Sequence, residues 1–257
     1  LNQVGIGQPN VNGTTLGTLR VPVPPLTEQH RIVSEVERVN TLVDIIEQNQ
    51  EGLSVAISQA KAKILDLAIH GKLVPQDPTD EPAEVLLKRI NPKWKPSDNP
   101  HYEQMPLGWA ECALEDILDY EQPQAYIVES TDYSDEYTTP VLTAGKSFVI
   151  GYTNETKGIC NNLPVIIFDD FTTDSKYVDF PFKVKSSAMK ILHSREVVIP
   201  QYVQMFMGIT KLVGDTHKRY WISEYSKLRI GLPPYAEQAR IVAKVTKLFD
   251  LLNNISN

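Results

Sequence analysis

Residues 233–242 read Pro-Pro-Tyr-Ala-Glu-Gln-Ala-Arg-Ile-Val, and residues 24–33 read Pro-Pro-Leu-Thr-Glu-Gln-His-Arg-Ile-Val. The two stretches lie 209 positions apart and share the pattern Pro-Pro-x-x-Glu-Gln-x-Arg-Ile-Val. In both, two prolines that cannot continue a helix precede apolar residues with helical spacing. A separation this long is not the period of a solenoid. The repeat therefore indicates large modules that alternate with a common helical connector.

The composition limits the classes of protein that fit the chain. Its 257 residues suffice for one large domain or two smaller ones. The net charge of −7 argues against a protein coated in basic residues. The cysteines Cys112 and Cys160 lack metal or disulfide spacing, which favours reduced thiols in a cytoplasmic protein. No signal peptide or bilayer-length apolar run occurs, so we expect no membrane partner. The first residue is Leu1, and we expect a piece of a longer product.

A long helix is predicted over residues 27–71, with Thr27 as N-cap and Gly71 as its stop. Its apolar residues step by four and three over about five heptads, which predicts a coiled coil. The seam is Ile32, Val36, Val39, Val43, Ile46, Gln50, Leu53, Ile57, Ala60, Ile64 and Leu67. Gln50 either fixes the pairing register or is a tolerated polar defect. A helix of 44 residues would be about 66 Å long, roughly two turns of duplex DNA.

The remaining residues divide by composition. Residues 1–26 form loops and short strands, residues 72–106 are a proline-rich connector, and residues 227–257 hold the second repeat copy and its helix. The connector contains a short helix over residues 81–90, with Asp80 as its cap. Short β-branched runs predict a strand-rich domain over residues 107–226, so the fold class is α+β. The runs are Tyr126–Val128, Pro140–Leu142, Phe148–Ile150, Val165–Phe168 and Val197–Ile199.

Charge is unevenly distributed along this domain. Residues 107–136 contain nine acids and no Lys or Arg, so we expect this face to turn away from phosphate. Residues 176–219 contain eight basic residues against three acids, with aromatic residues between them. Basic side chains beside hydroxyls suit phosphate oxygens, and Arg or Lys in a groove can read guanine edges. An ordinary solvated charged face is the alternative interpretation.

No catalytic or metal site is predicted. Residues 232–235 resemble the Asn/Asp-Pro-Pro-Tyr/Phe motif of amino-methylating DNA methyltransferases, but Leu232 cannot hydrogen-bond the target amino group. Asp169, Asp170 and Asp174 lie too close together for a metal-dependent nuclease. Such a run after a strand is more often a solvated turn or polar support for a binding loop. The five histidines lack ligand spacing.

Together, these motifs resemble a type I restriction–modification DNA specificity subunit, in a partial or half-sized form. The resemblance rests on the two repeat copies, on residues 64–76 (Ile-Leu-Asp-Leu-Ala-Ile-His-Gly-Lys-Leu-Val-Pro-Gln), and on Pro106-Leu107-Gly108-Trp109, which is similar to the opening of that family's recognition domains. Residues 7–12 are similar to the closing stretch of a preceding recognition domain.

The resemblance implies a function and partners. In that family, two target-recognition domains alternate with two helices that form an antiparallel coiled coil. The subunit is not catalytic: it reads a bipartite double-stranded DNA target and docks methyltransferase subunits, which bind S-adenosylmethionine, and through the complex a restriction/translocase subunit. No cofactor is expected on this chain. Either a recognition domain is missing, or the chain is a half-sized form that makes a homodimer.

Specific residues follow from this interpretation. The repeat cores predict two equivalent partner-docking surfaces, made by Glu28, Gln29, Arg31, Glu237, Gln238 and Arg240. The DNA-contacting candidates are Lys146, Lys176, Tyr177, Lys183, Lys185, Ser186, Lys218, Arg219 and Tyr220. Lys183 and Lys185 should point to one face of a strand, and Lys183→Ala should lower the salt slope of DNA binding by about one. Two other classes remain open: a coiled-coil scaffold for another protein, and an enzyme that acts alone.

Overall fold

The computed structural model describes residues 17, 22–96, 104–145, 147–210, 212 and 219–256. The chain divides into two units, residues 1–55 and 56–257, and each is described by itself. Among the helices within these described ranges, none is long and apolar enough to cross a lipid bilayer.

The long predicted helix is present as α2 (Leu26–Ile69). It begins one residue earlier than predicted, because the carbonyl of Pro25 accepts the first bonds, from the N–H groups of Glu28 and Gln29. Thr27 therefore lies inside the first turn and is not the N-cap. The predicted stop is confirmed, since Gly71 adopts a φ of +65° and the Lys72 N–H bonds to the Leu67 carbonyl.

The predicted seam has different surroundings in the two units. In the first unit its described side chains are exposed, for example Val36 at 52 % and Val43 at 44 %. In the second unit Ile57 is 8 % exposed, and Ala60, Ile64 and Leu67 are half-buried. The coiled coil itself stays a prediction, because the described seam of the first unit is not buried against a second helix.

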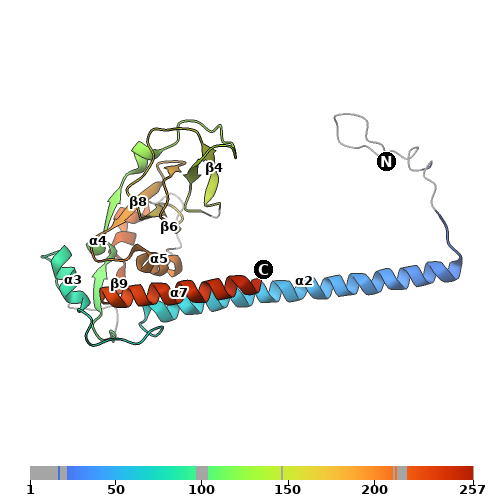
Figure 1. The fold of residues 1–257 in the computed structure, drawn as a ribbon, viewed down its shortest axis with the longest axis horizontal. Helices are drawn as coiled ribbons and strands as arrows, with labels where there is room; N and C mark the ends of the chain where they lie inside the picture. The colour runs from blue at the N-terminus through green and yellow to red at the C-terminus, as the bar shows by residue number, and fades with distance from the viewer. Residues whose placement is uncertain are drawn as a thin grey trace. The chain divides into compact units, whose positions relative to one another are not determined.

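In the second unit, the end of α2 runs antiparallel to α7 (Tyr235–Ser256) (Figure 1). Lys61 Nζ donates to Asn253 Oδ1 over 2.6 Å and lies 5.6 Å from the ring centroid of Phe249. Further along, Gln76 Nε2 donates to Glu237 Oε1. As the chain proceeds from Lys61 to Gln76, its partners in α7 move back from Asn253 to Glu237, which is the pattern of an antiparallel pair.

The connector helix α3 (Ala83–Ile90) is shorter than predicted. Pro82 occupies the N-cap position without a side-chain cap, and the Ala83 N–H bonds to the Gly108 carbonyl. Asp80 does not cap the helix because its carboxylate accepts hydrogen bonds from Arg240.

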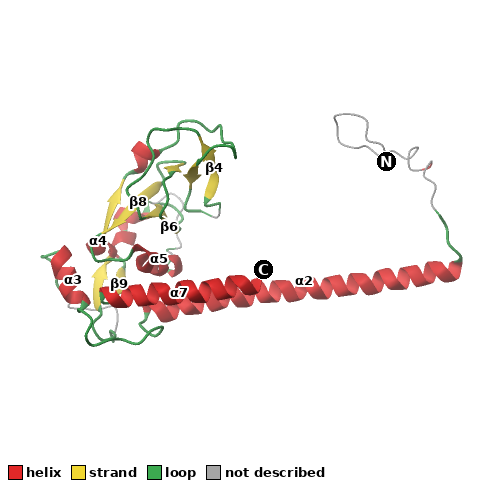
Figure 2. Ribbon diagram, viewed as in Figure 1, coloured by secondary structure: helices red, strands yellow, loops and turns green. Residues whose placement is uncertain are grey.

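The rest of the second unit is mixed helix and sheet, as the α+β prediction requires (Figure 2). A two-stranded sheet pairs β1 (Ala110–Ala113) with β9 (Arg229–Leu232). An antiparallel sheet has the order β2 (Leu118–Glu121), β8 (Met189–Ser194), β5 (Val165–Asp169) and β6 (Ser175–Val178). A third sheet has the order β4 (Val149–Thr153), β3 (Thr139–Leu142) and β7 (Lys183–Val184), with β3 and β7 parallel.

The short helices are α4 (Leu114–Ile117), α5 (Pro200–Ile209) and α6 (Tyr220–Ser223), with 3₁₀ turns at Pro123–Tyr126 and Tyr225–Lys227. Two predicted strand runs were wrong. Tyr126 ends the first 3₁₀ turn, and Ile127 forms an isolated bridge to Val184. Val197 has a φ of +63°, which interrupts an extended chain just before Pro200 starts α5.

Two apolar cores hold these elements. The larger core joins the end of α2, α3, β1, α5, α6 and α7, and includes the aromatic cluster of Phe168, Trp221 and Tyr225. The smaller core lies between the four-stranded and three-stranded sheets, around Phe182 and Val165. Burying a large aromatic side chain contributes roughly 2–3 kcal/mol, so the sheets are firmly placed against the helices.

Candidate nucleic-acid interface

The acidic and basic segments of the sequence are neighbours in space, because β2 pairs with β8. Arg195 lies 2.8 Å from Asp119, and His193 Nε2 lies 2.9 Å from Glu121 Oε2. We expected the acidic run to form a separate face turned away from phosphate, and this expectation was wrong for part of the run. Part of it neutralises the basic segment, so the local positive excess counted from the sequence overstates the charge available to DNA.

Lys183 does not fit the predicted role of a phosphate contact. Its side chain is 3 % exposed, and Nζ lies 2.9 Å from Glu155 Oε2 and donates to the Lys157 carbonyl over 2.7 Å. Burial raises the pKa of Glu155, but hydrogen bonds from Lys183 and two backbone N–H groups outweigh it and lower that pKa. The charged form of Glu155 is thus favoured beside Lys183. The shared face with Lys185 was also wrong, because β7 ends at Val184 and Lys185 is exposed.

Neither of the two tyrosine candidates is exposed, since Tyr220 is buried and Tyr177 is half-buried. Tyr220 is 4 % exposed. Tyr177 follows the exposed Lys176 in β6, and successive strand residues point to opposite faces. Tyr177 lines a groove of about 420 Å³ together with Gln201 and Phe249, which places it against α5 and α7.

Asp170 joins the segments that carry the remaining candidates. Its Oδ2 lies 3.3 Å from Lys190 Nζ in an ion pair whose side chains are 1–2 % exposed. Its Oδ1 accepts the Trp221 N–H at 2.8 Å, and its carbonyl accepts the Tyr220 N–H at 3.0 Å. Its own N–H bonds to the Ala188 carbonyl. Of the two roles considered for this acidic run, Asp170 is polar support for a loop.

These bonds hold together a surface that we call the loop cluster, made of residues 169–174, residues 185–188 and Arg219. Lys185, Ser186 and Arg219 are exposed on it. The guanidinium carbon of Arg219 lies 5.7 Å from the ring centroid of Phe171. The Lys185 N–H bonds to the Leu142 carbonyl, which places the loop cluster beside the predicted turn between β3 and β4.

The loop cluster contains three of the nine candidates, and Lys176 lies on the adjoining edge strand β6. Lys146 and Lys218 fall outside the described residues. Sequence reasoning missed Phe171, and for Asp170 it left polar support for a loop as one of two roles. The Asp169-Asp170-Phe171 run after a buried strand was the only signal for either, because which loops meet depends on the strand order.

The two repeat copies do not present equivalent surfaces. In the second copy Glu237 and Gln238 are fully buried, and Gln238 Oε1 accepts the Ile199 N–H at 2.8 Å. In the first copy Glu28 and Arg31 are exposed. The prediction of two matching docking surfaces is therefore corrected, because the second copy holds its own domain together.

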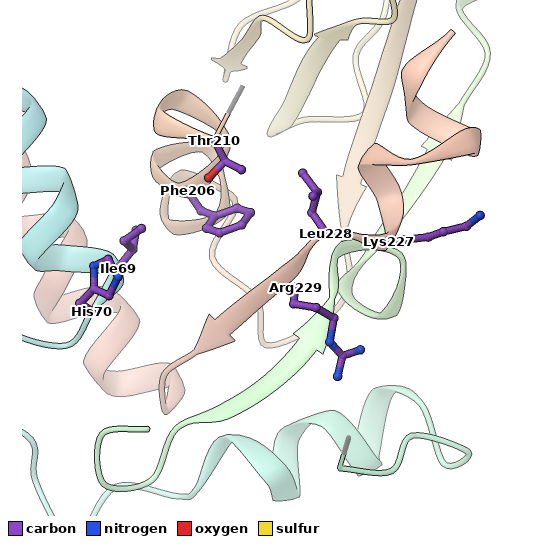
Figure 3. Close-up of a pocket in the computed structure, with 7 residues that line it drawn as sticks. All are labelled: Ile69, His70, Phe206, Thr210, Lys227, Leu228 and Arg229. Atoms are coloured by element: carbon purple, nitrogen blue, oxygen red, sulfur yellow. The ribbon is translucent and has the colours of Figure 1, made fainter. Parts of the chain in front are cut away.

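A pocket of about 350 Å³ at the end of α2 contains basic side chains but does not direct them inward. It is lined by Ile69, His70, Phe206, Thr210, Lys227, Leu228 and Arg229. Lys227 Nζ donates to the Ser223 carbonyl and Arg229 Nε to Glu111 Oε1. Figure 3 shows both side chains pointing away from Ile69 and Phe206. We therefore assign no ligand to this pocket.

The thiols and acids show no reactive grouping among the described residues. Cys112 and Cys160 are free and buried, and burial raises the pKa of the Cys160 thiol to about 11. Across the described ranges, no three His, Cys, Asp or Glu side chains are grouped so as to hold a metal ion.

Comparison with known proteins shows which proteins the chain is similar to. Residues 1–54 match the family model described as type I restriction modification DNA specificity domain. The chain is 48 % identical over 142 residues to the EcoR124I/EcoR124II specificity subunit of Escherichia coli, covering 53 % of this chain and 33 % of that protein. It is 30 % identical over 243 residues to the EcoEI specificity subunit of Escherichia coli, covering 77 % and 40 %.

A solved structure from work on complex assembly and conformational transition of the type I R-M system aligns with a TM-score of 0.57 at 18 % identity. It covers 92 % of this chain and 55 % of that chain, and supports the fold alone. The chain is similar to type I restriction enzyme specificity subunits, as its motifs predicted. It spans a third to two fifths of the length of the two Escherichia coli relatives.

Proposed function

We propose that this chain recognises double-stranded DNA as a non-catalytic part of a type I restriction–modification complex. The observation that carries the proposal is the loop cluster, where Lys185, Ser186 and Arg219 are exposed on loops tied together by Asp170. Cationic and hydroxyl side chains on rigidly supported loops suit phosphate and base-edge contacts. The relationship to specificity subunits supports the same function.

The complex would supply the chemistry. Methyltransferase subunits would bind S-adenosylmethionine, a restriction/translocase subunit would join through them, and this chain would need no cofactor. The exposed Glu28 and Arg31, with the half-buried Gln29 between them, form the docking surface that we propose for a methyltransferase. The exposed seam of α2 in the first unit favours pairing with a second helix as a coiled coil. The cytoplasm is the compartment that these partners require.

Binding at different salt concentrations tests the DNA contact. Lys185→Ala should weaken binding to all duplexes alike and lower the salt slope by about one, because one phosphate contact is lost. The matched control is Lys183→Ala, which removes a buried charge of the same sequence segment. It should leave the salt slope unchanged while lowering the free energy of unfolding by about 3 kcal/mol.

A gel shift and co-purification with a methyltransferase separate this function from the alternatives. A specificity subunit should show both, whereas a protein scaffold would shift no DNA. Methyl transfer from S-adenosylmethionine by the purified chain alone would contradict the non-catalytic assignment. An unchanged salt slope in Lys185→Ala would remove the loop cluster from the interface.

A further inference from the structure

Arg219 differs from three of the other basic residues described between positions 176 and 219. Lys183, Lys190 and Arg195 are each ion-paired within the protein. Within the described residues, no carboxylate is paired with the guanidinium of Arg219, whose contact is the face of Phe171. Such a cation–π contact uses the positive charge and leaves N–H groups of the guanidinium available.

Hydrogen bonds fix the backbone from Arg219 onward. The Arg219 carbonyl accepts the Ser223 hydroxyl at 2.7 Å, and the next residue, Tyr220, donates its N–H to the Asp170 carbonyl. Phe171 is held in turn, because its N–H bonds to Asp169 Oδ1 at 2.9 Å. Both members of the contact therefore stand on restrained backbone. A restrained side chain loses less conformational entropy on binding than a mobile one, which favours selective recognition.

The chemistry of Arg separates it from its neighbour Lys185. A guanidinium offers two parallel N–H donors that match O6 and N7 of guanine in the major groove, while an ammonium acts as a point charge. Lys185 lies on the adjacent loop, which the Asp170–Ala188 bond joins to the loop of Phe171. The loop cluster thus carries one group suited to a base edge beside one suited to phosphate.

We propose that Arg219, held over Phe171, is a specificity-determining residue that reads a guanine in the major groove, while Lys185 contacts the phosphate backbone. The inference rests on the proposed function. It goes beyond it by naming the base and by dividing the roles between two cations.

Selection from a fully randomised duplex library tests the inference with the full chain. The wild-type chain should enrich a motif that contains at least one strongly preferred guanine. Arg219→Lys keeps the charge but loses the two parallel N–H donors of the guanidinium. Discrimination at one guanine should therefore fall about 10- to 100-fold, while the rest of the motif is retained. Lys185→Ala should keep the full motif and bind every sequence more weakly.

Two further measurements make the result decisive. Phe171→Leu removes the ring and should reduce discrimination at the same guanine as Arg219→Lys, and thermal unfolding of each variant checks that the fold is intact. If Arg219→Lys retains the full guanine preference, the inference is wrong and the proposed function stands. If the wild-type chain enriches no sequence, the proposed function fails, and the inference fails with it.

Discussion

The two copies of the Pro-Pro-x-x-Glu-Gln-x-Arg-Ile-Val repeat have the same local structure and different surroundings. Gln29 Nε2 donates to the Pro24 carbonyl at 2.8 Å, and Gln238 Nε2 donates to the Pro233 carbonyl at 3.0 Å. Beyond this bond the copies diverge. Gln238 also binds the Ile199 N–H and is fully buried, whereas Gln29 is half-buried on the first turn of α2.

The burial of the second copy shows that the repeat motif joins neighbouring elements when it lies inside a domain. Gln76 Nε2 donates both to the Gly71 carbonyl and to Glu237, so the end of α2 is tied to the start of α7. Arg240 binds Asp80 in the same region. The motif in the second copy is therefore a junction between helix, connector and sheet. The first copy leaves the corresponding Glu28 and Arg31 exposed.

The largest expected effect on stability is at Gly71, which ends α2 at the junction formed by the second copy of the repeat. Gly71→Ala should lower the free energy of unfolding by about 4 kcal/mol, because a Cβ would overlap the Pro106 ring and the φ of +65° disfavours alanine. The control is Gly52→Ala, within α2 in the first unit, where nothing lies within 4 Å of an added Cβ. It should raise stability by about 0.5–1 kcal/mol. Urea unfolding followed by circular dichroism measures the stability of both variants. Equal changes in stability would contradict the close packing of Gly71 at the junction.

The glutamines test the repeat directly. Gln238→Ala should cost about 3 kcal/mol, because the part-buried Ile199 N–H and the buried Pro233 carbonyl both lose a partner. Gln29→Ala loses one part-buried bond and should cost about 1 kcal/mol or less. The urea midpoints of the two variants give the comparison. A cost for Gln29→Ala as large as that for Gln238→Ala would mean that the first copy is also enclosed.

A smaller difference is expected at the arginines. Arg240→Ala should cost about 1 kcal/mol, because its partly exposed ion pair with Asp80 is lost. Arg31 is exposed on α2, so Arg31→Ala should change stability by less than about 0.5 kcal/mol. Thermal unfolding at low and high salt separates them: only the Arg240 variant should lose part of its deficit at high salt, through screening of the pair in the wild type.

The smallest effect is a pH dependence at Glu237. Burial raises the pKa of Glu237 above the ordinary value of 4.5, against the opposing hydrogen bond from Gln76. A raised pKa means that the charged form is disfavoured in the folded protein, so wild-type stability is reduced as pH rises from 4.5 through the raised value. Glu237→Gln removes this cost. In urea unfolding, the stability of the Glu237→Gln variant relative to wild type should increase over that pH interval. A difference in stability that does not change with pH would contradict the burial of the Glu237 charge.

Periodicity in the sequence predicted the long helix, and strand-like runs predicted the position of β5, since both depend on neighbours along the chain. The same reasoning misplaced Lys183 and Tyr220 in the candidate interface. Lys183 is buried because Glu155 and the Lys157 carbonyl come from a loop far along the chain. Tyr220 is buried because α6 packs beside the turn of Asp170. No local pattern contains either contact.

The sequence by itself determined the repeat, the proline-glutamine bond that opens both helices, and the glycine that ends the first. These depend on backbone geometry and on side chains within five residues of one another. Only the tertiary structure decided which copy is enclosed and which basic residues stay exposed, because burial and ion pairing depend on segments brought together by sheet order. For this reason identical residues, such as Gln29 and Gln238, have different surroundings in one chain.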